Sequence, residues 1–382
     1  MRYRPLGKTG MNVSEIGLGC EGFLNFDQEE TDACIRKAVE NGINFMDFYS
    51  SDPEAHKRVG KAIRPYRNRF HFQIHMCSAW KDGQYYATRD LETAKTAFKQ
   101  TMEEFGFDYV DVAMLHYVDS LETFNKCLDN GIIAYLRELK DKGIARSVGL
   151  SSHNPEVALK AVREDLIDVL MFSINPCYDL QPADEDVEKL WASEAYDREL
   201  LNMEPLREEL YELCLKKGVG ISVMKAFGGG DLLDGSQSPA KVALTPDECI
   251  AYALDRPAVA SICCGIRSME DLERSIAYEE ADSEEKDYAR ALASFPKISW
   301  EEHCMYCSHC APCSAGISVA DLTKLLNLAR AQSEVAETVR EHYKDLKAHA
   351  GDCIECGVCE TRCPFKVDII GNMREARNIF GY

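Results

Sequence analysis

The chain has 382 residues, 17 cysteines and a formal net charge of −20. This negative charge argues against nucleic acid and anionic membrane as partners, because both select cationic proteins. The N-terminal residues lack the apolar core of a secretory signal, and no run approaches the ~18 apolar residues of a spanning helix, so we expect a cytoplasmic protein. In that compartment cysteines favour free thiols or metal ligands over disulfides.

The first 280 or so residues contain eight short apolar runs. They are apolar on both faces, as strands of a parallel sheet covered on both sides are. In chain order the predicted strands are Glu15–Glu21, Asn44–Tyr49, Phe70–Cys77, Val110–His116, Ala145–Ser151, Asp168–Asn175, Gly220–Phe227 and Val259–Gly265.

Helix signals lie between these runs. Thr245-Pro246 with Glu248 forms a capping box with proline at the first helical position, and Asn154-Pro155 and Ser268 also indicate helix starts. Strands and helices that alternate in this number predict an α/β fold of the (β/α)8 TIM-barrel type. The alternative, a doubly wound open sheet, lacks a GxGxxG motif after its first strand. The polar connection 178–204 is expected to be a lid or a surface excursion.

The last eighty or so residues contain two cysteine runs. The first is Cys304-x2-Cys307-x2-Cys310-x2-Cys313, and the second is Cys353-x2-Cys356-x2-Cys359-x3-Cys363-Pro364. The second run has the spacing of bacterial ferredoxins, in which the fourth cysteine ligates the other of two clusters. We therefore expect a TIM barrel over residues 1–285 and a small ferredoxin-like domain with two [4Fe–4S] clusters over residues 286–382.

The ferredoxin rule assigns the eight cysteines crosswise. Cys304, Cys307, Cys310 and Cys363 are expected to hold one cluster, and Cys353, Cys356, Cys359 and Cys313 the other. The first run departs from the pattern in its last spacing and in having Ser314 where proline is usual. Two structural zinc sites are the alternative, since paired cysteines also bind zinc.

Several motifs resemble the aldo-keto reductase superfamily. They are Tyr3–Gly10 followed by Val13–Gly19, then Gly42–Asp47, Leu115-His116 and Val148–Ser151. The run Met224–Gly230, together with the cysteine-rich tail, is similar to the iron–sulfur branch of that superfamily. The resemblance covers essentially the whole chain.

The resemblance implies a TIM barrel that reduces carbonyl compounds with NADPH through an Asp, Tyr, Lys and His tetrad. Asp47 matches the aspartate and His116 the histidine, but Asp52 stands where the tyrosine belongs and His75 where the lysine belongs. Tyr49 lies two residues beyond Asp47 on the same side of the strand, from where it could approach the site.

These replacements change the expected chemistry. The carboxylate of Asp52 is ionised at neutral pH and cannot donate a proton unless burial raises its pKa. A histidine titrates near neutrality and can donate, so we expect acid–base work from His75 and His116 in place of the ordinary carbonyl-reductase mechanism. An alternative is a metal site at the barrel mouth, with Cys20 and Cys77 as further ligands.

The resemblance also implies a nucleotide site, of which this sequence keeps only some residues. Ser151 is kept, Ser152 replaces the usual asparagine, and Gly265-Ile266-Arg267-Ser268 keeps a cation and a helix N-terminus for an anion. Lys225 is expected to add a phosphate contact. The expected cofactors are the two clusters and NADP(H), and a flavin stays open.

Three functions follow, in order of preference. The first is an iron–sulfur oxidoreductase of the aldo-keto reductase type, whose clusters relay electrons between a redox partner protein and a small-molecule site at the barrel mouth. The second is a non-catalytic electron-transfer or scaffold subunit. The third is an NADPH-dependent carbonyl reductase with incidental clusters.

Overall fold

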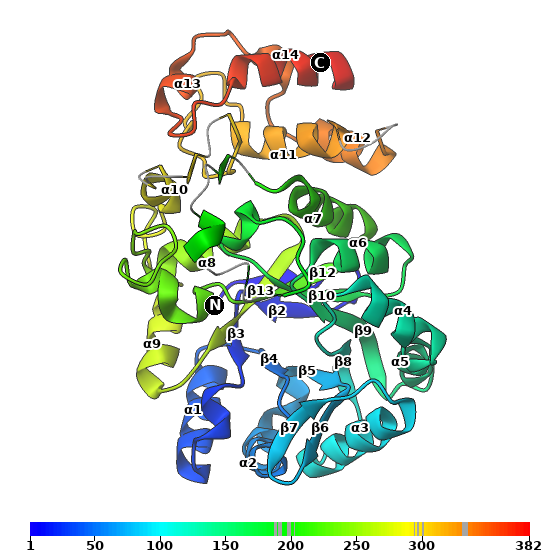
Figure 1. The fold of residues 1–382 in the computed structure, drawn as a ribbon. Helices are drawn as coiled ribbons and strands as arrows, with labels where there is room; N and C mark the ends of the chain where they lie inside the picture. The colour runs from blue at the N-terminus through cyan, green and yellow to red at the C-terminus, as the bar shows by residue number, and fades with distance from the viewer. Residues whose placement is uncertain are drawn as a thin grey trace.

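A closed barrel of eight parallel strands forms the core of the molecule (Figure 1). The computed structural model describes residues 1–186, 189, 193–196, 200–201, 203–293, 295, 298–299, 302–330 and 335–382. The barrel strands are β3 (Ile16–Gly19), β4 (Phe45–Phe48), β5 (His71–Met76), β8 (Val110–Leu115), β9 (Ala145–Ser152), β10 (Val169–Ser173), β12 (Gly220–Met224) and β13 (Val259–Gly265). They pair in the order β10-β12-β13-β3-β4-β5-β8-β9, which confirms all eight predicted strands and the barrel fold.

Helices surround the barrel on its outer face (Figure 1). They are α1 (Gln28–Glu40), α2 (Pro53–Ile63), α3 (Leu91–Phe105), α4 (Leu121–Asp129), α5 (Ile132–Asp141), α6 (Pro155–Arg163), α7 (Pro205–Lys217), α8 (Pro246–Leu254) and α9 (Met269–Ala277). The predicted starts of three of them are confirmed: Thr245 and Glu248 form a reciprocal capping box on α8, and Asn154 and Ser268 cap α6 and α9.

The N-terminal end of the barrel is closed by a hairpin. Strand β1 (Tyr3–Pro5) pairs with β2 (Asn12–Ser14), and Arg4 of this hairpin donates to the carbonyl of Leu254 at 2.6 Å. Apolar side chains of the hairpin pack against Phe45, Met114 and Val169 inside the barrel. The opposite end, where the strands reach their carboxyl termini, is therefore the end that is open to build a site.

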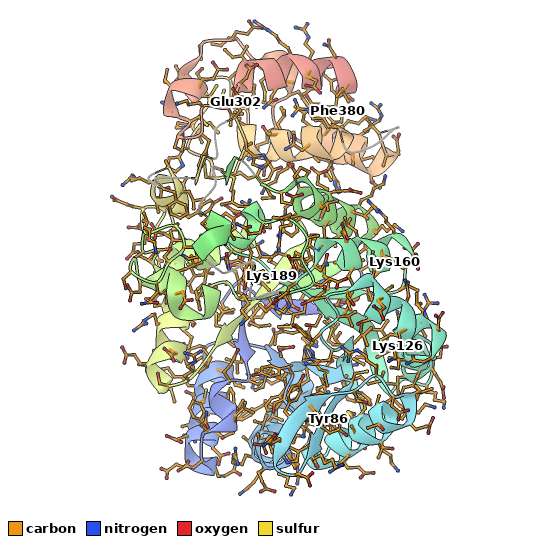
Figure 2. All side chains as sticks on the ribbon, viewed as in Figure 1. Tyr86, Lys126, Lys160, Lys189, Glu302 and Phe380 are labelled. Carbon is orange, nitrogen blue, oxygen red and sulfur yellow. The ribbon has the colours of Figure 1, made fainter. Side chains whose placement is uncertain are left out.

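The C-terminal segment forms a separate layer against the flank of the barrel, next to α7 (Figure 1). Its helices are α11 (Val319–Arg330), α12 (Glu337–Lys344), α13 (Val358–Arg362) and α14 (Ile369–Phe380), while α10 (Tyr288–Leu292) packs beside α8 of the barrel. In Figure 2, Glu302 and Phe380 lie in this layer. The predicted boundary at 285/286 falls in the loop between α9 and α10 and stays a prediction. None of the helices in the described part of the chain has the length and apolarity to span a membrane.

The connection after β10 takes part in joining the two layers. Residues 178–180 form a buried turn of helix, and the short strand β11 (Leu200–Leu201) pairs in parallel with β14 (Ile298–Ser299), which precedes the first cysteine run. Most of residues 187–199, on which the expectation of a lid also rests, lie outside the described residues.

A buried arginine fastens the first cysteine loop to the barrel. Arg256 follows α8, is 2% exposed, and donates from Nη2 to the carbonyl oxygen of Met305 at 3.0 Å. The hydroxyl of Tyr288 lies 2.6 Å from that same oxygen and 2.7 Å from Oδ2 of Asp255, so its one proton is shared between two acceptors. These contacts set the position of the cysteine loop relative to α8.

A cavity of about 840 Å³ lies between α7 and the C-terminal layer. Half of its described lining is charged, and this half includes Glu208, Glu212, Arg330 and Lys366. Burial, and then the neighbouring carboxylates of Glu208 and Glu209, raises the pKa of Glu212 from its ordinary 4.5 to about 8. The folded protein therefore keeps this carboxyl protonated at neutral pH.

We expect Tyr288→Phe to lower the free energy of unfolding by about 1–3 kcal/mol, the cost of leaving a part-buried acceptor without its donor. Urea unfolding measures this difference. The matched control is Tyr3→Phe, because Tyr3 is 50% exposed and its hydroxyl donates to a surface carbonyl, that of Gly42. Equal losses in the two variants would contradict the role assigned to Tyr288.

Glu212 should make stability depend on pH. Between 4.5 and about 8 the unfolded chain loses a proton that the folded protein keeps, so this group makes stability fall as pH rises, and the loss saturates above about 8. Glu212→Gln removes this pH dependence. Its free energy of unfolding should therefore rise relative to that of wild type by up to ~1.4 kcal/mol for each pH unit within that window. Urea unfolding at several pH values tests this, with the exposed Glu122→Gln as control.

Candidate functional site

Three of the predicted catalytic side chains meet at the carboxyl ends of neighbouring strands. Asp47 lies on β4, His75 on β5 and His116 directly after β8, and all three are buried. Because β4 pairs with β5 and β5 with β8, the barrel register brings their side chains to one place. The prediction that they act together in catalysis stays a prediction, but they are in contact.

A continuous chain of hydrogen bonds joins these groups. Asp47 Oδ1 lies 2.8 Å from His75 Nε2, and His75 Nδ1 lies 2.8 Å from His116 Nδ1. Beyond them, His116 Nε2 lies 2.6 Å from the hydroxyl of Tyr85. Behind them, Gln73 Nε2 donates to Asp47 Oδ1 at 2.6 Å and holds the carboxylate in place.

The electrostatics favour neutral imidazole at the centre of this chain. Burial, and then the neighbouring His75, lowers the pKa of His116 well below its ordinary value. Burial also raises the pKa of the Tyr85 phenol. At neutral pH His116 is therefore an uncharged hydrogen-bonding group that can accept from one side and donate from the other.

The two other predicted catalytic residues lie differently. The ring of Tyr49 stacks on that of His116, with centroids 6.2 Å apart and planes at 12°, and burial raises the pKa of its phenol. Asp52 lies outside the chain of hydrogen bonds. Its carboxylate is the N-cap of α2 and accepts from the backbone amides of Glu54 and Ala55.

A cavity of about 310 Å³ opens at the mouth beside Tyr49. Three predicted nucleotide-binding residues line it, namely Lys225, Gly265 and Arg267. Arg274 from α9 adds a further cation that the sequence analysis did not select. The cluster of cations gives the cavity the character of an anion site.

Two acidic residues, Glu21 and Asp271, line the cavity together with these cations. Glu21, which also lines the cavity, has a carboxyl oxygen that is buried without a hydrogen-bond partner. Burial raises its pKa, and the charges of Arg267 and Lys225 partly oppose that rise. An anion bound at this wall would lie beside Arg267 and Lys225, with the carboxyl of Glu21 close by.

The predicted serines have separate environments. Ser268 caps α9 by accepting from the amide of Asp271, at the edge of the same cavity. Ser152 is fully buried, and its hydroxyl donates to Asp119 Oδ1 at 3.0 Å. Asp119 also accepts from the backbone amide of His153. Ser151 is buried on β9 and pairs in register with Met171 of β10. The lining of the mouth cavity includes neither Ser151 nor Ser152.

The eight tail cysteines line two cavities. Cys304, Cys307, Cys310 and Cys363 line a narrow one, together with apolar side chains such as Val319 and Phe365. Cys313, Cys353, Cys356 and Cys359 line a second one of about 360 Å³, which Cys310 also borders. Each cavity thus gathers one of the two predicted ligand sets, including the crosswise members Cys363 and Cys313.

The first cavity, of about 20 Å³, has four cysteines in its lining, and the second has five. Each iron of a [4Fe–4S] cluster takes its own cysteine, so the ligands of a cluster stand further apart than the ligands of one ion. Within the ranges described, no group of three or more Cys, His, Asp or Glu side chains is gathered tightly enough for a single metal ion. Zinc would need four ligands converging on one point.

The same finding bears on the barrel mouth, where a metal site was an alternative. Cys20 and Cys77 are fully buried, and burial raises the pKa of Cys20 well above its ordinary value and that of Cys77 to about 12. Neutral buried thiols are poor ligands and nucleophiles. We therefore read both as core residues.

Tyr85 is the main residue that the sequence analysis missed. It lies on β7 (Gln84–Ala87), which forms a hairpin with β6 (Ser78–Lys81) directly beyond the end of β5. The signal in the sequence was Asp82-Gly83, both with positive φ, a dipeptide typical of two-residue hairpin turns. The contact between Tyr85 and His116 joins residues 31 positions apart, and no motif in the sequence indicates it.

The chain is similar to a known protein family and to proteins within it. The model of the "Aldo/keto reductase family" matches residues 15–247. The chain is 27% identical over 312 residues to "Uncharacterized oxidoreductase YqkF" of Bacillus subtilis, covering 78% of this chain and 97% of that protein. An aldo-keto reductase of Mycolicibacterium smegmatis is 23% identical over 158 residues, covering 41% of this chain and 52% of that protein.

Solved structures share the fold. The holo form of aldo-keto reductase AKR11C1 from Bacillus halodurans has a TM-score of 0.59 at 22% identity, covering 76% of this chain and 96% of its own. The putative aldo-keto reductase PA4992 from Pseudomonas aeruginosa has a TM-score of 0.55 at 21% identity, covering 72% of this chain and 93% of its own. More than a fifth of this chain lies outside each of these two matches.

Proposed function

The chain belongs to the aldo/keto reductase family and is an oxidoreductase of that type, and on that premise we propose that its tail holds two [4Fe–4S] clusters. The single observation that supports this proposal is the pair of cavities, each of which includes in its lining the four cysteines of one predicted set. The clusters would supply one-electron transfer between an external carrier and the barrel mouth.

The chain's own residues give the two cavities different roles. Arg256 and Tyr288 tie the loop of Cys304 and Cys307 to the barrel wall through the carbonyl of Met305. Apolar side chains around that cavity keep water away from its thiolates, which is one of the levers by which a protein sets the potential of a metal group. The cluster bound there would lie against the barrel wall.

The second cavity faces outward. Cys356 is exposed, and the flanking Ile354 and Val358 are 67% and 43% exposed. An exposed apolar rim around a redox group suits brief contact with another protein, since electron-transfer encounters use small interfaces. We assign contact with the redox partner protein to this face.

At the barrel mouth we assign proton transfer to the buried chain of Asp47, His75 and His116. Asp47 accepts from His75 and fixes its tautomer, and His116 is held neutral by burial, so the pair can pass a proton. Tyr49 stacks on His116 and would orient a small-molecule substrate. Asp52, engaged in capping α2, is given no step in this proposal.

NADP(H) is the cofactor that the mouth cavity fits best. Lys225, Arg267 and Arg274 supply three cations, and Ser268 begins a nine-residue helix whose N-terminus favours an anion. These residues support a second candidate, an NADPH-dependent reductase of small carbonyl compounds with the clusters as accessories. The hydroxyl of Ser152 is bonded to Asp119, which argues against the ordinary contacts of this position with a nicotinamide ring. A flavin therefore stays open as an alternative cofactor.

A purely electron-carrying or scaffold role is less well supported. The curated relative that spans most of the chain is named an oxidoreductase, and the polar groups of the barrel mouth are in hydrogen-bond contact rather than scattered.

Protein purified without oxygen should contain about eight irons per chain, four for each cluster. Metal analysis and the visible absorption of the clusters measure this. Cys363→Ala and Cys304→Ala should each lose about half of the iron. Cys34→Ala, a substitution of a buried core cysteine, should lose none. Zinc in place of iron would refute the proposal.

The crosswise assignment has its own test. The double variant Cys304→Ala/Cys363→Ala should keep about half of the iron, because both residues belong to one cluster. The double variant Cys304→Ala/Cys356→Ala should lose essentially all of it. Loss of essentially all of the iron in both double variants would mean that each cysteine run binds its own cluster.

Arg267→Glu should raise the Kd for NADPH by about 10- to 100-fold, because a charge-assisted hydrogen bond contributes about 1.5–3 kcal/mol. Calorimetric titration with NADPH measures the change, and a smaller change with NADH would locate the contact at the extra phosphate. Arg69→Glu, at the exposed opposite end of the barrel, is the control. Undiminished NADPH binding by the Arg267 variant would place the nucleotide elsewhere.

A further inference from the structure

Tyr85 reaches the buried histidines from the surface. It lies on the outer strand of the β6–β7 hairpin and is 40% exposed, yet its hydroxyl lies 2.6 Å from His116 Nε2. Arg89, just beyond the hairpin, donates to the carbonyl oxygens of His116 and Tyr117, so the two segments are held together by the backbone as well. The part-exposed Tyr85 side chain therefore connects the buried network to the surface.

The hydrogen bonds of the network determine one another. An ionised carboxylate can only accept, so Asp47 takes its bond from the Nε2 proton of His75. When His75 carries only that proton, its Nδ1 is bare and accepts from the Nδ1 proton of His116. His116 in turn has a bare Nε2, and the hydroxyl of Tyr85 must donate to it. All three bonds point the same way, from the surface to Asp47.

We propose that Tyr85 is the outer terminus of a proton relay that runs through His116 and His75 to Asp47. The relay rests on the proposed function in that it serves the reaction at the barrel mouth. It adds a residue from the hairpin to that site, outside the positions that the family resemblance supplied. Tyr85 Oη is the atom that exchanges protons with the substrate oxygen or with water.

The transfer balances along the chain. When Tyr85 Oη takes a proton from a substrate hydroxyl, its own proton passes to His116 Nε2. The Nδ1 proton of His116 passes to His75 Nδ1, and the Nε2 proton of His75 passes to Asp47 Oδ1. Each imidazole ring loses a proton from one nitrogen and gains one on the other. After the transfer the four groups together hold one more proton than before, and that proton is on Asp47. In reverse, the relay delivers that proton to a carbonyl oxygen.

No electron moves through this relay. Its contribution is to take a proton from, or return it to, a site whose groups are buried too deeply to exchange with water directly. The side chain of His75 is 1% exposed and that of Asp47 is 3% exposed. Asp47 can stay buried as a charge because it accepts from both Gln73 and His75.

Nitrogen-15 NMR of the full-length protein with labelled histidine tests the relay. We expect His116 to be the Nδ1–H tautomer and His75 the Nε2–H tautomer. In Tyr85→Phe the bare Nε2 of His116 loses its donor, so its resonance should move downfield. A wild-type His116 protonated at Nε2, or a Tyr85→Phe spectrum identical to that of wild type, would overturn the proposal.

Exchange of the His75 Nε2 proton with D2O measures conduction directly. Tyr85→Phe should slow this exchange at least about tenfold, the factor that ~1.4 kcal/mol of barrier gives. The matched control is Tyr86→Phe, the next residue of the hairpin (Figure 2), because successive strand residues face opposite sides and it should leave the rate unchanged. Equal rates in wild type and Tyr85→Phe would refute conduction through Tyr85.

These measurements involve no turnover and no cluster. A protein without iron that reduces no carbonyl compound would refute the proposed function, and the NMR result would still decide the relay. Conversely, an unchanged exchange rate would remove Tyr85 from the mechanism without touching the iron content.

Discussion

The carboxylate of Asp47 is a charge buried inside the barrel, 2% exposed, and much of the mouth is arranged around that fact. Such a charge needs hydrogen-bond donors, and Gln73 and His75 supply them. Gln73 is itself held by the hydroxyl of Ser222, across the barrel. Because a carboxylate only accepts, it fixes which nitrogen of His75 carries the proton, and that choice passes outward to His116. One buried charge thereby orders a line of neutral groups.

A second buried network ties the C-terminal layer to the barrel. Asp179 accepts from the hydroxyls of Tyr211 and Tyr252, and its charge lies near those of Arg207 and Arg256. Arg256 stacks on the ring of Tyr252 and reaches Met305 in the first cysteine loop. The tail is therefore attached through the protein interior rather than by a flexible tether. Groups held in its cavities keep a fixed relation to the barrel, which one-electron transfer over a set distance requires.

Local chemistry explains what could be predicted. Eight apolar runs became eight strands because a parallel sheet covered by helices must be apolar on both faces. Helix starts at Asn154, Thr245 and Ser268 were predictable because capping is a contact between near neighbours. The grouping of the tail cysteines rested on a spacing rule, and the two cavities gather the same groups.

The sequence by itself determined the barrel, the family and the identity of Asp47, His75 and His116, since strand patterns and motifs are local properties of the chain. Only the tertiary structure decided what those residues touch. A gap-free count put Asp52 where a tyrosine belongs, but its carboxylate caps α2, while the hydroxyl beside His116 comes from Tyr85 on a hairpin. The physical reason is that side-chain contacts depend on how separate strands close around the barrel axis, which no spacing along one strand encodes.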